Sequence, residues 1–365
     1  MSQPWTTEVR APGKLYIAGE YAVVEPGIPA VLIAVDRYVT VRVRDAVGTG
    51  HIISDLNAGS RLEWYRRDSD MVIEADEALF SFVLAAMRIV EEVVVEFGEP
   101  LRIFDLAITS ELDDDSGRKF GLGSSAAVTV ATVAALCAHY GLDLSRMEQL
   151  KLALLAGTEV QRSGSGGDIA ASMFGGWIAY TAFDRAWARR ERAQRSLAEL
   201  LALDWPGLSV RRVAPPDGLR LLVGWTGSPA STSRLVGGVQ SRKDQGGTDY
   251  AHFLAESRRC VTSLVDALNA GDREGVLAGI RRNRELLRQL GERTGITIET
   301  PTLRHLIETA ADYGGAAKTS GAGGGDCGIV LIDADAGIDG LLALWERADI
   351  RVLNLSVHQP EGPVE

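Results

Sequence analysis

Residues 117–136 read GRKFGLGSSAAVTVATVAAL: a basic pair, two spaced glycines, two serines and a run of small apolar residues. The apolar run predicts a helix that reaches about Tyr140 and ends at Gly141. Ser124 and Ser125 are suited to cap its first turn. Because the free amides and the dipole of a helix start favour an anion, the stretch predicts a phosphate-binding loop. An ordinary glycine turn followed by a serine cap remains the alternative.

The sequence excludes two common phosphate-binding motifs. The chain contains no GxxxxGK followed by Ser or Thr, so it is not a P-loop protein. In a dinucleotide-binding GxGxxG motif, the third glycine would stand where this chain has Ala126. The P-loop and dinucleotide-binding classes are therefore set aside for this loop.

A second glycine-rich stretch, TEVQRSGSGGDIAASMFGGW at 158–177, contains two acids. Glu159 falls on a predicted helix, and Asp168 follows the glycine-serine loop. Phosphoryl transfer needs a carboxylate for the metal ion and a second acid near the acceptor, which these residues could supply. The alternative is that Asp168 caps a short helix and Glu159 belongs to a surface ion pair.

A third glycine-rich stretch is KTSGAGGGDCG at 318–328, with five glycines from Gly321 to Gly328. Such a loop can press its backbone against a bound ligand. The alternative is a flexible hairpin, but the apolar strands that flank the loop closely favour contact with a ligand.

Lysine is rare in this chain and is concentrated near these glycines. Five of the 38 basic residues are lysine, and Lys14, Lys119 and Lys318 lie in or beside glycine-rich stretches. Lysine is a compact charge on a flexible stem, which suits contact with a moving phosphoryl group.

Composition limits the class of protein. At 365 residues the chain is too long for one ordinary core and predicts two domains. Apolar residues make up 46%, as in soluble globular proteins, and the formal net charge of −11 argues against broad nucleic-acid binding. The first residues lack the apolar core of a signal peptide, and the apolar stretch at 126–138 is too short to span a bilayer. We therefore expect no nucleic-acid partner and no membrane partner.

Cysteine and histidine usage gives two further expectations. Cys137, Cys260 and Cys327 are widely spaced and odd in number, which predicts reduced thiols and a cytoplasmic location. The five histidines have no metal-ligand spacing, so no structural zinc is expected. The sequence leaves open whether the chain is a monomer or a homodimer.

Hydrophobic periodicity predicts an α+β fold, because strands and helices alternate without a regular parallel βαβ rhythm. Strand patterns occur at 8–45, 101–112, 219–226, 329–333 and 351–357. Besides the helix from Ser124, helical patterns occur at 76–97, 145–162, 184–202, 249–291, 301–313 and 338–347. Pro215 and Pro216 lie between two strand-like runs and predict a boundary between domains 1–214 and 215–365.

Three motifs in a fixed order resemble those of the GHMP kinases: PGKL…GEY near the N-terminus, GLGSSAA and KTSGAGGGDCG. With LLVGWTGSPASTS, the resemblance extends from about Arg10 to Val357. It is greatest to the bacterial members that phosphorylate 5-phosphomevalonate. The resemblance implies a two-domain GHMP kinase fold. Its N-terminal ATP-binding domain would be like the second domain of ribosomal protein S5, with a left-handed βαβ crossover, and its C-terminal domain would be ferredoxin-like.

The activity that this resemblance implies is the Mg-ATP-dependent phosphorylation of 5-phosphomevalonate to 5-diphosphomevalonate. The reaction belongs to the mevalonate pathway of isoprenoid biosynthesis. ATP and Mg²⁺ would be the cofactors, and the phosphorylated acceptor would be the small-molecule partner.

Carried over by position, the resemblance also implies roles for individual residues in a cleft between the domains. Lys14 and Asp168 would be catalytic, and Ser125 and Glu159 would hold Mg²⁺. The residues implied in ATP binding are Lys119, Gly121, Leu122, Gly123, Ser124, Ser125 and Ala126. The residues implied in substrate binding are Lys14, Lys119, Ser165, Gly166, Ser233, Gly321, Ala322 and Gly323. Thr232 and Arg234 are further candidates beside Ser233.

The basic pair before the loop fits an acceptor that already carries a phosphate. Two unit charges 4 Å apart interact by about 4 kcal/mol at an effective dielectric of about 20, so two polyanions need cations between them. Lys14 and Lys119, with a contribution from Arg118, could supply these. A phosphomonoester is already mostly ionised at neutral pH, since its second pKa is about 6, so Asp168 is expected to orient the acceptor more than to remove a proton. The alternative for Lys119 is a solvent-facing loop edge.

Three other functions remain open from the sequence. A sister kinase could act on mevalonate or a sugar. A GHMP-type protein could bind nucleotide and regulate without catalysing, although Lys14, Ser125, Glu159 and Asp168 are all present. A related decarboxylase is disfavoured by the GRKFGLGSS stretch.

Overall fold

The structure is a computed structural model and describes residues 4–55, 59–73, 77–114, 116–228, 235–239 and 247–360. Its strands form two sheets, one of eight strands and one of four, and helices pack on both. The predicted α+β class is therefore confirmed. No helix in these ranges is long and apolar enough to cross a membrane.

The larger sheet is built around two long antiparallel strands, β1 (Thr7–Ala18) and β2 (Pro29–Asp45), joined through the short 3₁₀ turn η1 (Ala22–Val24). β-branched residues dominate β2, which is buried along most of its length as its pattern predicted. The other strands are β3 (Thr49–Ser54), β4 (Arg61–Arg67), β5 (Asp70–Ile73), β6 (Phe104–Ser110), β7 (Trp177–Thr181) and β8 (Ser209–Arg212). The order is β5-β4-β3-β6-β2-β7-β8, with β1 paired to β2; β3 and β6 run parallel and the other pairs antiparallel.

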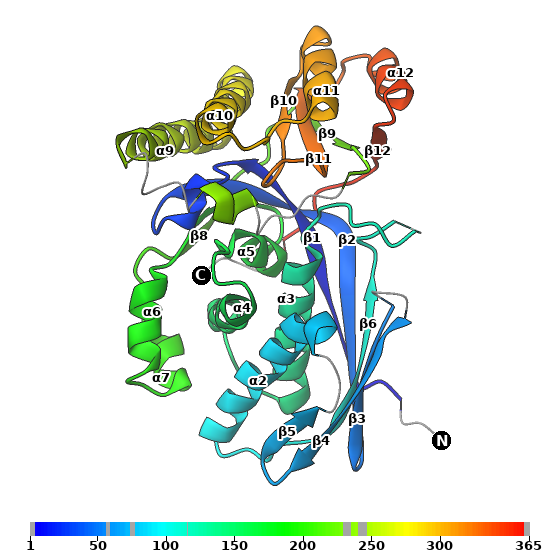
Figure 1. Cartoon of the computed structure of the whole chain (residues 1–365), viewed down its shortest axis with the longest axis vertical. Helices are drawn as coiled ribbons and strands as arrows, with labels where there is room; N and C mark the ends of the chain where they lie inside the picture. Colours follow the sequence, from blue (N-terminus) through cyan, green and yellow to red (C-terminus); the bar gives the residue numbers. More distant parts are fainter. Residues whose placement is uncertain are drawn as a thin grey trace.

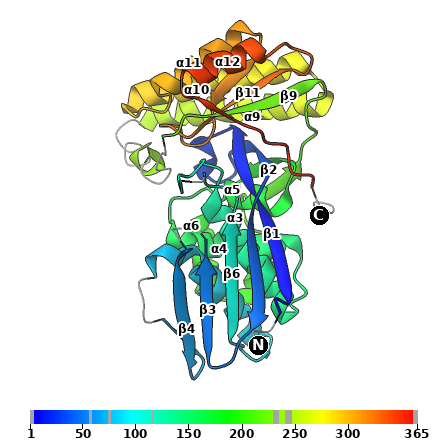
Figure 2. The same cartoon turned by 90° about the vertical axis from the view of Figure 1, so that its right-hand side faces the viewer.

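Helices cover one face of this sheet, as Figures 1 and 2 show. They are α2 (Ser81–Glu96), preceded by the turn η2 (Ala78–Phe80), then α3 (Ser124–Tyr140), α4 (Arg146–Val160) and α5 (Gly167–Phe174). Helix α3 contacts β1 and β2 on one side and α2, α4 and α5 on the others. It is therefore buried around most of its circumference, which explains why its sequence has no polar face.

The smaller sheet and its helices cap the end of the larger sheet at which β1 ends (Figure 1). Its strands are β9 (Leu219–Trp225), β10 (Ala316–Thr319), β11 (Cys327–Asp333) and β12 (Arg351–Leu353). The helices are α9 (Gly247–Ala270), α10 (Arg273–Thr294), α11 (Pro301–Asp312) and α12 (Asp339–Arg347). All strand pairs are antiparallel in the order β10-β11-β9-β12. With helices after the first and third strands, this is the β-α-β-β-α-β arrangement of ferredoxin-like domains.

The last described residues return to the larger sheet. The predicted strand 351–357 was too long: β12 ends at Leu353, and Val357 then bridges to Val35 of β2. The amide of His358 donates to the carbonyl of Ala34 at 2.9 Å. Strands β8 and β9 belong to different sheets, so a boundary near residue 215 remains our proposal, with this tail crossing back over it.

Two predicted helices are each divided in the structure. The charged segment 184–202 forms α6 (Arg185–Arg192) and α7 (Leu197–Ala202), because Ser196 starts a new helix with a capping box to Glu199. The long segment 249–291 is broken at Gly271, and α10 begins after the side chain of Asp272 caps it. The other predicted helices and strands are confirmed within a few residues of their predicted ends.

Candidate active site

A cavity of about 360 Å³ lies where the two domains meet. Its walls come from the end of β1, the start of α3, the loop between α4 and α5, and the glycine-rich loop between β10 and β11. Three of the predicted motifs, far apart in the sequence, therefore meet in one cleft.

The start of α3 forms part of this wall, but its capping residue is not a serine. Gly123 is the N-cap, with φ 83°, and no side chain caps the helix. The expected serine cap is therefore wrong: Ser124 and Ser125 form the first turn of α3 and line the cleft. The first α3 amide that closes a helical bond is that of Ala127, which donates to the carbonyl of Gly123 at 3.0 Å. The amides before it are available to an anion.

Lys14 packs against the same loop. Its side chain is 8% exposed and its Nζ donates to the carbonyl of Gly121 at 3.3 Å, while its backbone amide donates to Leu122 at 2.8 Å. A Cβ on Gly123 would lie 2.7 Å from Cε of Lys14. The glycine therefore serves twice, by allowing a left-handed φ and by leaving room for the lysine stem.

Lys119 lines the cleft, whereas its neighbour Arg118 does not. Lys119 is exposed and bridges by its backbone to Asp113; burial raises the pKa of the Asp113 carboxyl, and the charge of Lys119 opposes that rise. Arg118 instead forms an ion pair with Asp114 at 2.9 Å and lies over the ring of Trp225, 5.0 Å from its centroid. The sequence-based contribution of Arg118 to the site is therefore not supported by its position.

Asp168 lies in the first turn of α5 and lines the cleft. The N-cap of this helix is Gly166, with φ 79°, so Asp168 is not the capping residue. Its Oδ1 accepts from the amide of Ile169 at 3.2 Å. Ser165 and Gly166 line the cleft beside it, and the Oγ of Ser165 accepts from the amide of Gly167 at 3.2 Å.

Glu159 does not reach the cleft. It is exposed on α4, where its charged neighbours are Arg192, Arg88 and Glu92. Thr158 and Gln161 line the cleft in this region instead. A metal ligand in the cleft would have to point into it, and the Glu159 side chain does not. We therefore do not retain the expected metal role of Glu159.

The glycine-rich loop of the C-terminal domain contributes only part of its predicted length. Gly321 and Ala322 line the cleft, but a Cβ on Gly323 would lie 2.2 Å from the carbonyl oxygen of Ile298, so this glycine faces the segment between α10 and α11. The same carbonyl accepts from the amide of Gly324 at 2.8 Å. The expected substrate contact of Gly323 is therefore corrected to a packing role.

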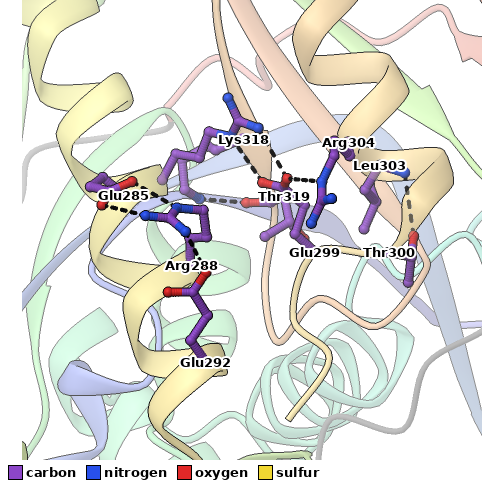
Figure 3. A network of polar contacts seen from close by, with 10 residues as sticks. Glu285, Arg288, Glu292, Glu299, Thr300, Leu303, Arg304, Lys318 and Thr319 are labelled. Atoms are coloured by element: carbon purple, nitrogen blue, oxygen red, sulfur yellow. Dashed lines mark hydrogen bonds and ion pairs between the residues drawn. The ribbon is translucent and has the colours of Figure 1, made fainter. Parts of the chain in front are cut away.

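The segment behind this loop is held by ion pairs, which Figure 3 shows. Glu299 accepts from Arg284 at 2.9 Å and from Arg304 at 3.2 Å, while Thr300 caps α11. Arg288 pairs with Glu285 and Glu292 on the same helix. These two ion pairs hold Glu299 in place. Its neighbour Ile298, whose carbonyl accepts from Gly324 of the glycine-rich loop, is thereby held as well.

A buried ion pair joins the two domains at the edge of the cleft. Lys318, 0% exposed, donates through Nζ to the carboxylate of Glu20, which lines the cleft. Glu20 also accepts from Nδ2 of Asn283 at 3.1 Å and from the amide of Gly321 at 3.3 Å. Burial lowers the pKa of Lys318, and the charge of Glu20 opposes this shift.

The cleft residues to which sequence reasoning gave no role include Tyr16, Glu20 and Asp326. Tyr16 could have been found, because it follows Lys14 by two positions on β1 and residues so spaced share a face of a strand. Glu20 and Asp326 stand inside the quoted motifs GEY and KTSGAGGGDCG, but these motifs alone do not show that the two side chains reach the cleft. The predicted candidates Thr232, Ser233 and Arg234 lie outside the described residues.

Comparison with known proteins assigns the chain to a family. The family model described as GHMP kinases N terminal domain matches residues 81–176, and the one described as GHMP kinases C terminal matches residues 264–346. A curated phosphomevalonate kinase from Streptomyces sp. (strain CL190) is 45% identical over 359 residues, covering 95% of this chain and 96% of that protein. The chain therefore belongs to the GHMP kinases, as its motifs predicted.

Two solved structures are similar along nearly the whole length. The Lin0012 protein from Listeria innocua has a TM-score of 0.91 and 36% identity, covering 97% of this chain and 98% of that one. Phosphomevalonate kinase of Streptococcus pneumoniae, in complex with phosphomevalonate and AMPPNP, has a TM-score of 0.83 and 32% identity, covering 96% and 99%. The Streptomyces relative and the Streptococcus pneumoniae structure are thus both phosphomevalonate kinases.

Proposed function

We infer that this chain transfers the γ-phosphoryl group of ATP to 5-phosphomevalonate, giving 5-diphosphomevalonate in the mevalonate pathway of isoprenoid biosynthesis. The observation that carries this inference is a cleft with two lysines, Lys14 and Lys119, beside the free amides of a helix start. The 45% identity to a phosphomevalonate kinase supports the choice of acceptor. An acceptor that carries its own phosphate needs more positive charge than an alcohol does.

The nucleotide phosphates are assigned to the start of α3. The amides of Ser124, Ser125 and Ala126, with the dipole of a 17-residue helix, stabilise negative charge there. Gly121, Leu122 and Gly123 complete the loop, and Gly123 lets it approach the ligand closely.

The oxygen atoms of the cleft suit Mg²⁺, which prefers oxygen ligands and is held in kinases by one or two protein groups and the nucleotide phosphates. No group of three or more His, Cys, Asp or Glu that could hold a metal ion occurs in the described part of the chain. Of the two residues expected to hold the ion, Ser125 lines the cleft and Glu159 does not, so Ser125 would hold it together with the nucleotide phosphates. When bound, Mg²⁺ supplies positive charge to the transferring phosphoryl group.

Lys14 and Lys119 bring the two anions together. Lys14 is held rigidly against the loop, so its ammonium group is oriented before substrate binds and needs little rearrangement as charge develops. Lys119 is exposed at the rim, where it can follow the phosphate of the acceptor as it enters. Asp168 orients the acceptor, while Ser165, Gly166, Gly321 and Ala322 line the remaining wall.

ADP release tests this function, with ATP and Mg²⁺ present and 5-phosphomevalonate or mevalonate offered in parallel. We expect turnover of the phosphorylated acceptor alone. Turnover of mevalonate instead would keep the ATP site but overturn the assignment of Lys119. If neither compound reacts while ATP still binds, the chain is a binding protein or uses another acceptor.

A further inference from the structure

Tyr16 is a cleft residue to which none of the roles above has been assigned. Its side chain is mostly buried, and its phenol oxygen lies 3.0 Å from Oγ of Ser165. Its backbone is clamped by Ser320 of the C-terminal domain, whose Oγ accepts from the Tyr16 amide and donates to its carbonyl, each at 2.9 Å. Both ends of this tyrosine are therefore fixed before any ligand binds.

Of the two hydroxyl hydrogens of Tyr16 and Ser165, one has no acceptor within the described part of the protein. Two hydroxyl groups carry two hydrogens, and the contact between Tyr16 and Ser165 uses one of them. The amide of Gly167 occupies one lone pair of the Ser165 oxygen at 3.2 Å. Within the described ranges, neither hydroxyl has a further acceptor on the protein. One hydrogen is therefore left to donate to a ligand.

Desolvation favours placing the free hydrogen on the serine. Ser165 is more exposed to the cleft than Tyr16, so an outward hydrogen costs less desolvation on Ser165. The phenol remains a donor, since burial, and next the charge of Asp168, raise the pKa of Tyr16 well above its ordinary value. With the phenol and the Gly167 amide both donating to Oγ, the serine O–H has a single direction left.

We propose that Tyr16 is a positioning residue that aims the Ser165 hydroxyl at an oxygen of the acceptor substrate beside Asp168. The oxygen that accepts this hydrogen bond belongs to a carboxylate, hydroxyl or phosphate group of the acceptor substrate. It does not belong to ATP, because the nucleotide phosphates are assigned to the start of α3. This proposal rests on the proposed function in so far as the acceptor is a small oxyanion.

Tyr180 of β7 offers a matched control. Its hydroxyl also holds Ser165, but it donates to the backbone carbonyl at 2.8 Å, and its side chain is fully buried and outside the cleft lining. Both tyrosines therefore support the same residue, and Tyr16 is the one that contacts the hydroxyl group.

The test compares Tyr16→Phe, Ser165→Ala and Tyr180→Phe by steady-state kinetics and thermal unfolding. We expect Tyr16→Phe to raise KM for the acceptor about tenfold, as the loss of about 1–1.5 kcal/mol of hydrogen bonding implies, with KM for ATP unchanged and kcat within about threefold. Ser165→Ala should give the same selective increase, and the double variant should add little to it, because both changes remove one donor. Tyr180→Phe should lower Tm without a selective change in KM.

Three results would overturn the proposal: an unchanged acceptor KM in Tyr16→Phe, an equal increase for ATP, or the same selective increase in Tyr180→Phe. If Tyr16→Phe fails to fold, Ser165→Ala and its acceptor KM decide. A wild-type protein that does not turn over 5-phosphomevalonate refutes the proposed function separately. The same comparison is then made with the acceptor that the wild type does use.

Discussion

The division of labour between Lys14 and Asp168 can be tested at the level of single residues. We expect Lys14→Met to lower kcat by about 10²–10³-fold, because it removes a preoriented charge from the phosphoryl group. Asp168→Asn should cost about tenfold at neutral pH, since the phosphate nucleophile is already ionised there. Single-turnover rates at saturating ATP measure both. A far larger loss for the aspartate variant would contradict this order and make Asp168 a general base.

The metal assignment gives a second prediction for single residues. Glu159→Gln should leave the Mg²⁺ concentration for half-maximal activity unchanged, because Glu159 lies outside the cleft lining. Ser125→Ala should raise that concentration several-fold, since it removes an oxygen ligand. Titration of activity with Mg²⁺ distinguishes the two. A raised requirement in the Glu159 variant would restore the sequence-based expectation.

Sequence reasoning at this scale found the residues that a motif carries and missed those placed by the fold. Lys14, Lys119, Ser125 and Asp168 all line one cleft. Glu159 was misplaced because its position on α4 and the direction of its side chain depend on how α4 packs, which a linear motif does not contain.

At the level of elements, Gly123 at the start of α3 can be compared with Gly141 at its end. Gly123→Ala introduces a left-handed alanine and a Cβ 2.7 Å from the stem of Lys14, so it should lower both stability and kcat. Gly141→Ala, at the other end of α3, has φ 70° but no atom within 4 Å of its Cβ. It should cost about 1–2 kcal/mol of unfolding free energy and leave kcat unchanged.

Chemical denaturation and steady-state kinetics of both glycine variants provide the comparison. If Gly123→Ala keeps the kcat of the wild type while losing stability, the close packing of Lys14 against this glycine has no catalytic role. If Gly141→Ala lowers kcat as much, the effect comes from α3 as a whole.

Elements were predicted well where their patterns are long and less well where local signals compete. Helix α3 ended at Gly141 as expected, because a glycine after a long apolar run is a strong stop signal. The segment 184–202 was taken as one helix although Ser196 and Glu199 form a capping box inside it. That signal was present in the sequence, whereas the departure of the chain from β12 after Leu353 depends on the distant partner Val35.

At the scale of the whole molecule, the Glu20–Lys318 pair is the clearest test of how the domains are joined. Lys318→Met should destabilise the protein by about 3–5 kcal/mol, because it leaves a buried carboxylate without its cation. The double variant with Glu20→Gln should recover part of this loss, since both charges are then removed. Thermal and chemical unfolding measure the effect. A single variant as stable as the wild type would show that the pair contributes nothing to the union of the domains.

The two-domain class followed from chain length and motif order, but the contacts that close the cleft did not. Tyr16 meets Ser320 and Glu20 meets Lys318 across about three hundred residues of sequence, and no local pattern predicts such pairs. The resemblance implied a cleft between the domains and named many of its residues, but the contacts that close it had to be seen in the structure.

The central claim is that a cation beside the phosphate loop recognises the phosphate of the acceptor. It is tested most directly by the KM for 5-phosphomevalonate of Lys119→Ala, with Arg118→Ala as the control. Arg118 is adjacent in sequence and exposed, yet paired with Asp114 outside the cleft lining. We predict that Lys119→Ala raises this KM by about ten- to a hundredfold, the loss expected for one charge-assisted contact, while Arg118→Ala stays near the wild type. An unchanged KM in Lys119→Ala, or an equal increase in both variants, would contradict the account.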